Sequence, residues 1–138
     1  MNYTISQAAN RIGIPDSTLR YYDKEGLLPS VKRVSGRRVF CDADFEWLEL
    51  IDCLKSTGMH IKDIREFIAL CAQGDSSLED RLAIILRQKD AVHQKISFLK
   101  ENLQHLEYKA WYYQTALEAG TEKVHEGDRA PSFSTERI

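Results

Sequence analysis

The second half of the chain carries a regular apolar repeat. Between positions 78 and 117, steps of four and three residues alternate, and eleven of the twelve positions reached are apolar or aromatic. These positions are Leu78, Leu82, Ile85, Lys89, Val92, Ile96, Leu99, Leu103, Leu106, Ala110, Tyr113 and Leu117. A 3.5-residue repeat of this length indicates a coiled-coil seam on a helix of roughly 60 Å. Because a small domain cannot bury such a seam, we predict a homodimer rather than an ordinary surface helix, with the polar Lys89 fixing register or orientation.

The first 26 residues predict two short helices joined by a tight turn. Thr4 and Gln7 have the spacing of a capping box, and apolar residues then recur at helical spacing up to Gly13. We expect Asp16 to cap a second helix that ends at Gly26, where a left-handed backbone closes the helix. Two such helices around Gly-Ile-Pro predict a helix-turn-helix.

The pattern changes after Pro29. Residues 31–40 read VKRVSGRRVF, and the Ser-Gly step between β-branched and basic residues indicates a β-hairpin, or wing. Asp42 or Asp44 is expected to cap a third helix through Leu54. The apolar stripe that we expect to face the core consists of Trp47, Leu50, Ile51 and Leu54.

These elements predict a mainly α fold. A winged helix-turn-helix with a small β-hairpin wing is followed by a long coiled-coil dimerisation helix. A fourth helix is expected from about Ile61 to Ala72, and a second capping box, Ser76 with Glu79, opens the long helix. The expected domains are a DNA-binding domain over 1–74, the coiled-coil helix over 75–119 and a flexible tail over 120–138.

Charge is segregated along the chain. The net charge of the whole sequence is -2, but residues 1–40 hold seven basic side chains against three acidic ones. Residues 41–74 hold three basic groups against seven acids, so the positive charge gathers in the first third. Such a distribution is typical of a phosphate-facing domain on a neutral or acidic body.

Several functional classes find no support in the residues. We see no nucleophile elbow, phosphate-binding glycine loop, metal-ligand spacing or carboxylate pair, so we predict neither an enzyme nor a cofactor. No apolar run approaches the roughly 20 residues that cross a bilayer, and the first residues do not form an export signal. Three widely spaced cysteines then indicate reduced thiols in the cytoplasm.

The second predicted helix, DSTLRYYDKEG, carries the candidate DNA contacts. Thr18, Arg20, Tyr21 and Tyr22 offer a guanidinium and hydroxyls of the kind that meet base edges and phosphates in a major groove. One of the two tyrosines is expected to pack inward. A dimer displays two such helices symmetrically, so the target is expected to be a pseudo-palindromic duplex.

Three blocks of sequence resemble the successive motifs of the MerR family. They read TLRYYDKEGLLP, SGRRVF and DADFEWLELIDCLKSTGMHIKDIREF, and the resemblance covers residues 3 to about 70. It implies a winged helix-turn-helix and an antiparallel coiled-coil dimer. It also implies activation by distorting an overlong promoter spacer, so that bound RNA polymerase engages both promoter elements.

The resemblance also implies roles for individual residues. Arg20 and Tyr21 are expected to contact DNA, and Tyr22 a phosphate. Arg38 is expected on the DNA backbone from the first wing, beside Arg37, and Lys62 on a phosphate from the second wing. In the first wing, Arg37 and Phe40 stand where the family usually has tyrosines. Phenylalanine has no hydroxyl, so Phe40 is expected to pack.

The effector is suggested by elimination within the family. There is no cysteine after Cys71, which disfavours the thiolate metal sites of metal-sensing relatives and an iron-sulfur cluster. The chain also has no large C-terminal ligand domain. The remaining resemblance is to the aldehyde- and electrophile-responsive subgroup that includes AdhR and NmlR, whose sensor cysteine matches Cys53.

Helical phase supports Cys53 as the sensor, since it falls off the apolar stripe of its helix, although a free cysteine is often buried instead. Cys41 and Cys71 are expected to be structural. Two alternatives stay open: a regulator that responds to a non-covalent small ligand, and a coiled-coil adaptor without DNA binding.

Overall fold

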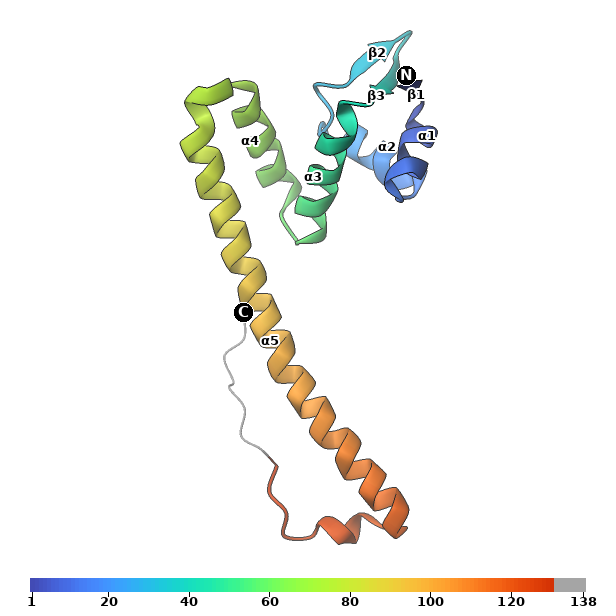
Figure 1. The fold of residues 1–138 in the computed structure, drawn as a ribbon, viewed down its shortest axis with the longest axis vertical. Coiled ribbons are helices and arrows are strands. Elements are labelled where there is room, and N and C mark those ends of the chain that lie inside the picture. The colour runs from blue at the N-terminus through green and yellow to red at the C-terminus, as the bar shows by residue number, and fades with distance from the viewer. Residues whose placement is uncertain (131–138) are drawn as a thin grey trace. The chain divides into compact units, whose positions relative to one another are not determined.

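The computed structural model describes residues 1–130. Contacts divide the chain into two units, Met1–Gln88, which we call the head, and a second unit from Lys89 onward. In chain order the elements are β1 (Asn2–Tyr3), α1 (Ile5–Ile12), α2 (Asp16–Lys24), β2 (Lys32–Val34), β3 (Arg37–Cys41), α3 (Asp44–Ser56), α4 (Ile61–Ala72), the 3-10 helix η1 (Gly74–Ser77), α5 (Leu78–Ala119) and the 3-10 helix η2 (Glu122–His125) (Figure 1).

The capping box at the start of α1 is confirmed. The Gln7 amide donates to Thr4 Oγ1 at 3.2 Å, and the Thr4 amide donates to Gln7 Oε1 at 2.9 Å. The predicted cap of α2 is wrong. Pro15 occupies the cap position and Asp16 is the first helical residue, so its carboxylate points away from the free amides and accepts from Ser6 Oγ.

The wing is confirmed as a two-residue hairpin. β2 and β3 pair antiparallel with Val34 opposite Arg37, and the turn residues Ser35 and Gly36 have φ of 51° and 78°. Positive φ at both turn residues matches the twist of the strands. β1 adds a third strand, with Tyr3 opposite Phe40, which the sequence pattern did not predict.

The start of α3 differs from the expectation. Ala43 precedes the helix, and neither Asp42 nor Asp44 caps it. Asp44 lies inside the first turn and its Oδ2 accepts from the Cys41 amide at 2.8 Å, whereas Asp42 Oδ1 accepts from Arg11 Nη1 at 2.8 Å. Both carboxylates therefore join α3 to the preceding elements instead of closing its own amides.

The core face of α3 is also shifted from the expected stripe. Ile51 and Leu54 are buried as expected, but Trp47 and Leu50 are only partly buried. Phe45 and Leu48 are buried in their place, because the face that α3 shares with α1 and the sheet is the one that starts at Phe45. Phe40 is fully buried in the same core, which confirms its packing role.

The capping box predicted at Ser76 is wrong. A 3-10 helix, η1, precedes α5, and the Ser76 hydroxyl donates to the Gln73 carbonyl at 3.3 Å. Ser77 is buried and its hydroxyl donates to the carbonyls of Leu70 and Gly74. In the turn between α4 and α5, the serine hydroxyls therefore bond to nearby backbone carbonyls and do not cap the amides of α5.

The long helix is confirmed as α5, Leu78–Ala119. Most large seam residues stand exposed in the single chain, with Leu99 at 63%, Leu106 at 66% and Leu117 at 83%. Ile85 is an exception, because it packs against the core of the head. Within residues 1–130, no helix combines the length and the apolar character that a membrane span requires.

The segment after α5, which is predicted to be a flexible tail, contains the 3-10 helix η2. Residues 121–128 return to the end of α5, and His125 is only 8% exposed. Its ring stacks on Tyr112 with centroids 4.2 Å apart, and its Nδ1 lies 2.8 Å from Asp128 Oδ2. The aromatic rings of Trp111 and Tyr112 on α5 cover His125, which the polar segment cannot bury by itself. Residues 131–138 lie outside the described part of the chain.

Candidate nucleic-acid interface

The two faces of α2 differ in chemistry. Leu19 and Tyr22 are buried in the head, whereas Arg20 is exposed and Tyr21 is 42% exposed. Thr18 is partly buried. Helical spacing separates these faces, since side chains at adjacent positions point about 100° apart. The outer face of α2 therefore presents a guanidinium and a phenol to solvent.

Tyr22 is the tyrosine of α2 that packs inward, as the sequence predicts for one of the two. Its side chain points inward, and its hydroxyl donates to Asp52 Oδ1 on α3 at 2.8 Å. Burial, and then the bond to the carboxylate, raise the pKa of Tyr22 above its ordinary value. The hydroxyl proton is used inside the head, where it ties α2 to α3, and the phosphate contact of Tyr22 stays a prediction.

Arg38 is also held inside the head. Its Nε donates to Asp23 Oδ1 at 2.8 Å, its Nη1 donates to the Val31 carbonyl at 2.6 Å, and its side chain is only 13% exposed. Arg33 reaches the same carboxylate from β2, with Nη2 at 3.4 Å. These contacts position the wing against α2, and the contact of Arg38 with the DNA backbone stays a prediction.

A hollow of about 800 Å³ lies between the wing and the start of the chain. Arg20 and Arg37 line it together with Arg38, and Arg33 adds a fourth guanidinium. Its other wall comes from β1 and the first turn of α1, including Ser6. This hollow brings the exposed basic groups of two elements together. The β1 side of the hollow cannot be predicted from local sequence patterns, because that strand reaches β3 by long-range pairing.

Lys62 lies apart from the residues that line this hollow. It is exposed in the first turn of α4. Arg65 on the same helix bonds to Glu25: its Nε donates to the Glu25 carbonyl at 2.6 Å and its Nη2 donates to Glu25 Oε2 at 2.7 Å. Since Glu25 directly follows α2, this pair ties the helix that carries Lys62 to the end of α2.

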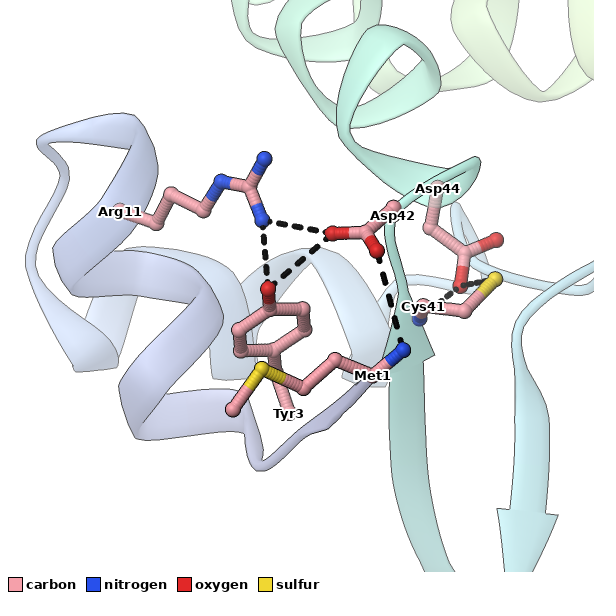
Figure 2. A network of polar contacts seen from close by, with 6 residues as sticks. All are labelled: Met1, Tyr3, Arg11, Cys41, Asp42 and Asp44. Atoms are coloured by element: carbon pink, nitrogen blue, oxygen red, sulfur yellow. Dashed lines mark hydrogen bonds and ion pairs between the residues drawn. The ribbon is translucent and has the colours of Figure 1, made fainter.

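A polar network holds β1 and α1 against the start of α3 (Figure 2). Arg11 Nη1 donates to Asp42 Oδ1 at 2.8 Å and to the Tyr3 hydroxyl at 2.9 Å, and the Tyr3 hydroxyl donates to Asp42 at 3.1 Å. The bonds from Arg11 and then Tyr3 hold the pKa of the Asp42 carboxyl below its usual range. The guanidinium also lies 4.0 Å from the centroid of Phe45. These contacts stabilise the wall opposite the wing.

The three cysteines lie in different settings. Cys53 is exposed on α3, and Cys71 is partly buried on α4. Cys41 is exposed, and its thiol donates to Asp44 Oδ2 at 3.3 Å. In residues 1–130, no three His, Cys, Asp or Glu side chains gather in a way that could hold a metal ion.

Comparison with known proteins agrees with this geometry. The model of the MerR HTH family regulatory protein matches residues 3–70, and that of the MerR DNA-binding region matches residues 45–108. An HTH-type transcriptional regulator of Haemophilus influenzae is 45% identical over 135 residues, which are 97% of this chain and 100% of that relative. The regulator AdhR of Bacillus subtilis is 37% identical over 86 residues, 62% of this chain and 61% of AdhR.

A solved structure extends the similarity to three dimensions. HiNmlR, a MerR family regulator lacking the sensor domain and crystallised with promoter DNA, superposes with a TM-score of 0.86 at 45% identity. The match covers 95% of this chain and 100% of that one. The chain belongs to the MerR family of helix-turn-helix regulators.

Proposed function

We propose that this protein is a transcription regulator that binds a pseudo-palindromic promoter as a homodimer. The observation that carries the proposal is the hollow between the wing and the start of the chain, which the exposed Arg20 and Arg37 both line. Guanidinium groups placed this way suit the sugar-phosphate backbone and the adjacent base edges. The similar regulator HiNmlR is bound to promoter DNA in its crystal structure, which supports the same partner here. We propose a cytoplasmic, non-enzymatic role, since the similar proteins are transcriptional regulators.

The dimer is proposed to form through the exposed seam of α5. Exposed leucines such as Leu99 and Leu106 lose water contact when two copies pair, which stabilises association. An antiparallel pair displays two heads to the two halves of a promoter. Distortion of an overlong spacer then lets RNA polymerase engage both promoter elements, as the family resemblance implies.

Electrophoretic mobility shift with the DNA upstream of the protein's own gene tests DNA binding. Arg20→Ala is expected to cost about 1–3 kcal/mol if the side chain reads a base edge. Arg37→Ala is expected to lower the slope of log affinity against log salt by about 1 if it neutralises one phosphate. The matched control Arg87→Ala, an exposed arginine of α5, leaves both unchanged.

Full affinity in an Arg20→Ala, Arg37→Ala double variant contradicts this docking. Lack of any shift with the wild-type dimer favours the coiled-coil adaptor instead.

Cys53 is proposed as the sensor of an aldehyde or related electrophile. Its thiol is exposed on α3 and is not used in the core. The sulfur adds to the carbonyl carbon of the aldehyde and the thiol proton passes to the carbonyl oxygen, which yields a hemithioacetal without another reactant. The added volume biases the arrangement of the heads on which spacer distortion depends.

Cys53→Ser is expected to keep operator affinity and lose the transcriptional response, measured with a promoter fusion under aldehyde challenge. Cys41→Ser is the matched control because Cys41 is also exposed, and Cys71→Ser is expected to respond normally. A full response of the Cys53→Ser protein points to a non-covalent ligand.

A further inference from the structure

The first turns of α5 are fastened to the rest of the head. Ile84 and Ile85 are partly buried and pack against the core. Gln88 follows one turn later, is also partly buried, and is the last residue of the head unit. The attachment of α5 to the core of the head therefore combines an apolar contact with a polar one at its end.

The polar contact joins Gln88 to Thr57, the residue that follows α3. Gln88 Nε2 donates to Thr57 Oγ1 at 2.8 Å and to the Thr57 carbonyl at 3.2 Å. Thr57 Oγ1 donates in turn to the Leu54 carbonyl at 2.7 Å, and the Thr57 amide donates to the Cys53 carbonyl at 3.0 Å. One side-chain amide thus holds the backbone and the hydroxyl of the α3 C-terminus together.

The hydrogen bonds of Gln88 depend on direction, whereas the packing of the two isoleucines does not. Apolar burial depends on area and not on direction, so Ile84 and Ile85 alone tolerate small rotations of α5. Hydrogen bonds weaken steeply as their angle departs from linearity. Nε2 of Gln88 bonds to two atoms of one residue, and this opposes rotation of α5 about its own axis at the boundary of the head.

We propose that the Gln88–Thr57 pair sets the orientation in which α5 presents each head, and so selects the spacing between the two half-sites that the dimer accepts. The inference rests on the proposed dimeric binding of a pseudo-palindrome. Adding one base pair between half-sites moves them apart by about 3.4 Å and turns one relative to the other by about 34°. A head held rigidly on α5 rejects that change, whereas a head free to rotate follows it.

Gln88→Leu removes both donors and keeps a side chain of similar size and helix propensity. Gln94→Leu is the matched control, since Gln94 lies on the same helix and donates to Asp90 within it at 3.2 Å. Thr57→Val removes the hydroxyl partner from the other side and serves as the second variant. Thermal unfolding and affinity for a single half-site confirm that each variant folds.

The experiment measures dissociation constants on duplexes whose half-sites are separated by the natural spacing or by one or two base pairs more or fewer. The wild type and Gln94→Leu are expected to prefer one spacing by about tenfold or more, equivalent to about 1.4 kcal/mol. Gln88→Leu and Thr57→Val are expected to lower this preference to about threefold or less while binding the natural duplex within about threefold of wild type.

Unchanged selectivity in Gln88→Leu and Thr57→Val overturns the inference and leaves the proposed function standing. A wild-type protein that binds every spacing equally well also overturns it. Failure of the proposed function is recognised separately, because the wild type then binds none of the duplexes.

Discussion

The head and the exposed part of α5 differ in how far their apolar residues are buried within the single chain. In the head, Phe40 is fully buried and Leu48 is 1% exposed, and ion pairs such as Asp23 with Arg38 join its elements. On α5, Leu99 and Leu106 are 63% and 66% exposed in a helix of the same chain. The head thus completes its core from its own residues, whereas the seam of α5 needs a second copy. The stability of the head is expected to be independent of protein concentration, whereas the stability of the paired α5 helices is expected to depend on it.

Removal of the seam is expected to have the largest effect. A chain that ends at Gln88 keeps Ile84 and Ile85 against the core and is expected to fold as a monomer. Its affinity for the full operator is expected to fall by about 10²–10⁴, because two half-sites no longer share one binding event. Sedimentation and mobility shift measure the two properties.

Ending the chain before Ser76 is a poorer test, since it also removes Ile84 and Ile85 from the core. A dimer in the chain that ends at Gln88 means that the interface lies in the head.

Leucine deletions sharpen the contrast between the two regions. Leu48→Ala leaves a cavity in the head and is expected to cost about 2–5 kcal/mol of unfolding free energy at every protein concentration. Leu99→Ala is expected to weaken the dimer, so that it dissociates on dilution at a higher protein concentration than the wild type. Denaturant titrations at several protein concentrations separate the two. A concentration-independent loss in Leu99→Ala shows that the seam packs within one chain.

Adjacent tyrosines of α2 provide a contrast inside the head. Tyr22→Phe removes the bond to Asp52 and is expected to cost about 1.5–3 kcal/mol of stability, as for a hydrogen bond to a charged group. Tyr21→Phe is expected to leave stability unchanged and to weaken DNA binding, since Tyr21 is 42% exposed. Thermal unfolding and mobility shift on both variants measure this. If Tyr22→Phe loses DNA affinity while its stability is unchanged, the result supports the phosphate contact of Tyr22.

The smallest effect concerns the network around Asp42. Its pKa is lowered in the folded state, first by the bond from Arg11 and then by that from Tyr3. The contact therefore stabilises the head at neutral pH, and this contribution is lost as pH falls below about 4 through the folded pKa. The midpoint of thermal unfolding should fall less steeply on acidification in Asp42→Asn. Asp63→Asn, at an exposed acid of α4, should behave as the wild type.

Local signals predicted most of the fold. The Thr4–Gln7 capping box, the Ser35–Gly36 hairpin and the seam of α5 each depend on residues close in sequence, so the pattern contained the information. Pairing of β1 with β3 depends on residues 37 or more positions apart, and no periodicity shows it.

The candidate site was predicted in part for the same reason. The outward positions of Arg20 and Tyr21 follow from helical phase together with the burial of the opposite face. Tyr22 and Arg38 face inward, where they bond to Asp52 and Asp23. A tyrosine and an arginine are residue types that often contact DNA, and the sequence does not show these internal partners. His125 shows the same limit, because its aromatic partners lie on α5 and a polar tail does not reveal them.

The stoichiometry of the protein on its operator tests the central claim most directly. Sedimentation of a duplex with increasing protein is expected to give two chains per duplex, with the Arg20→Ala protein still dimeric but unable to saturate the duplex at the same concentration. A complex of one chain per duplex, or an Arg20→Ala dimer that saturates it as the wild type does, contradicts the account of two heads carried by one seam.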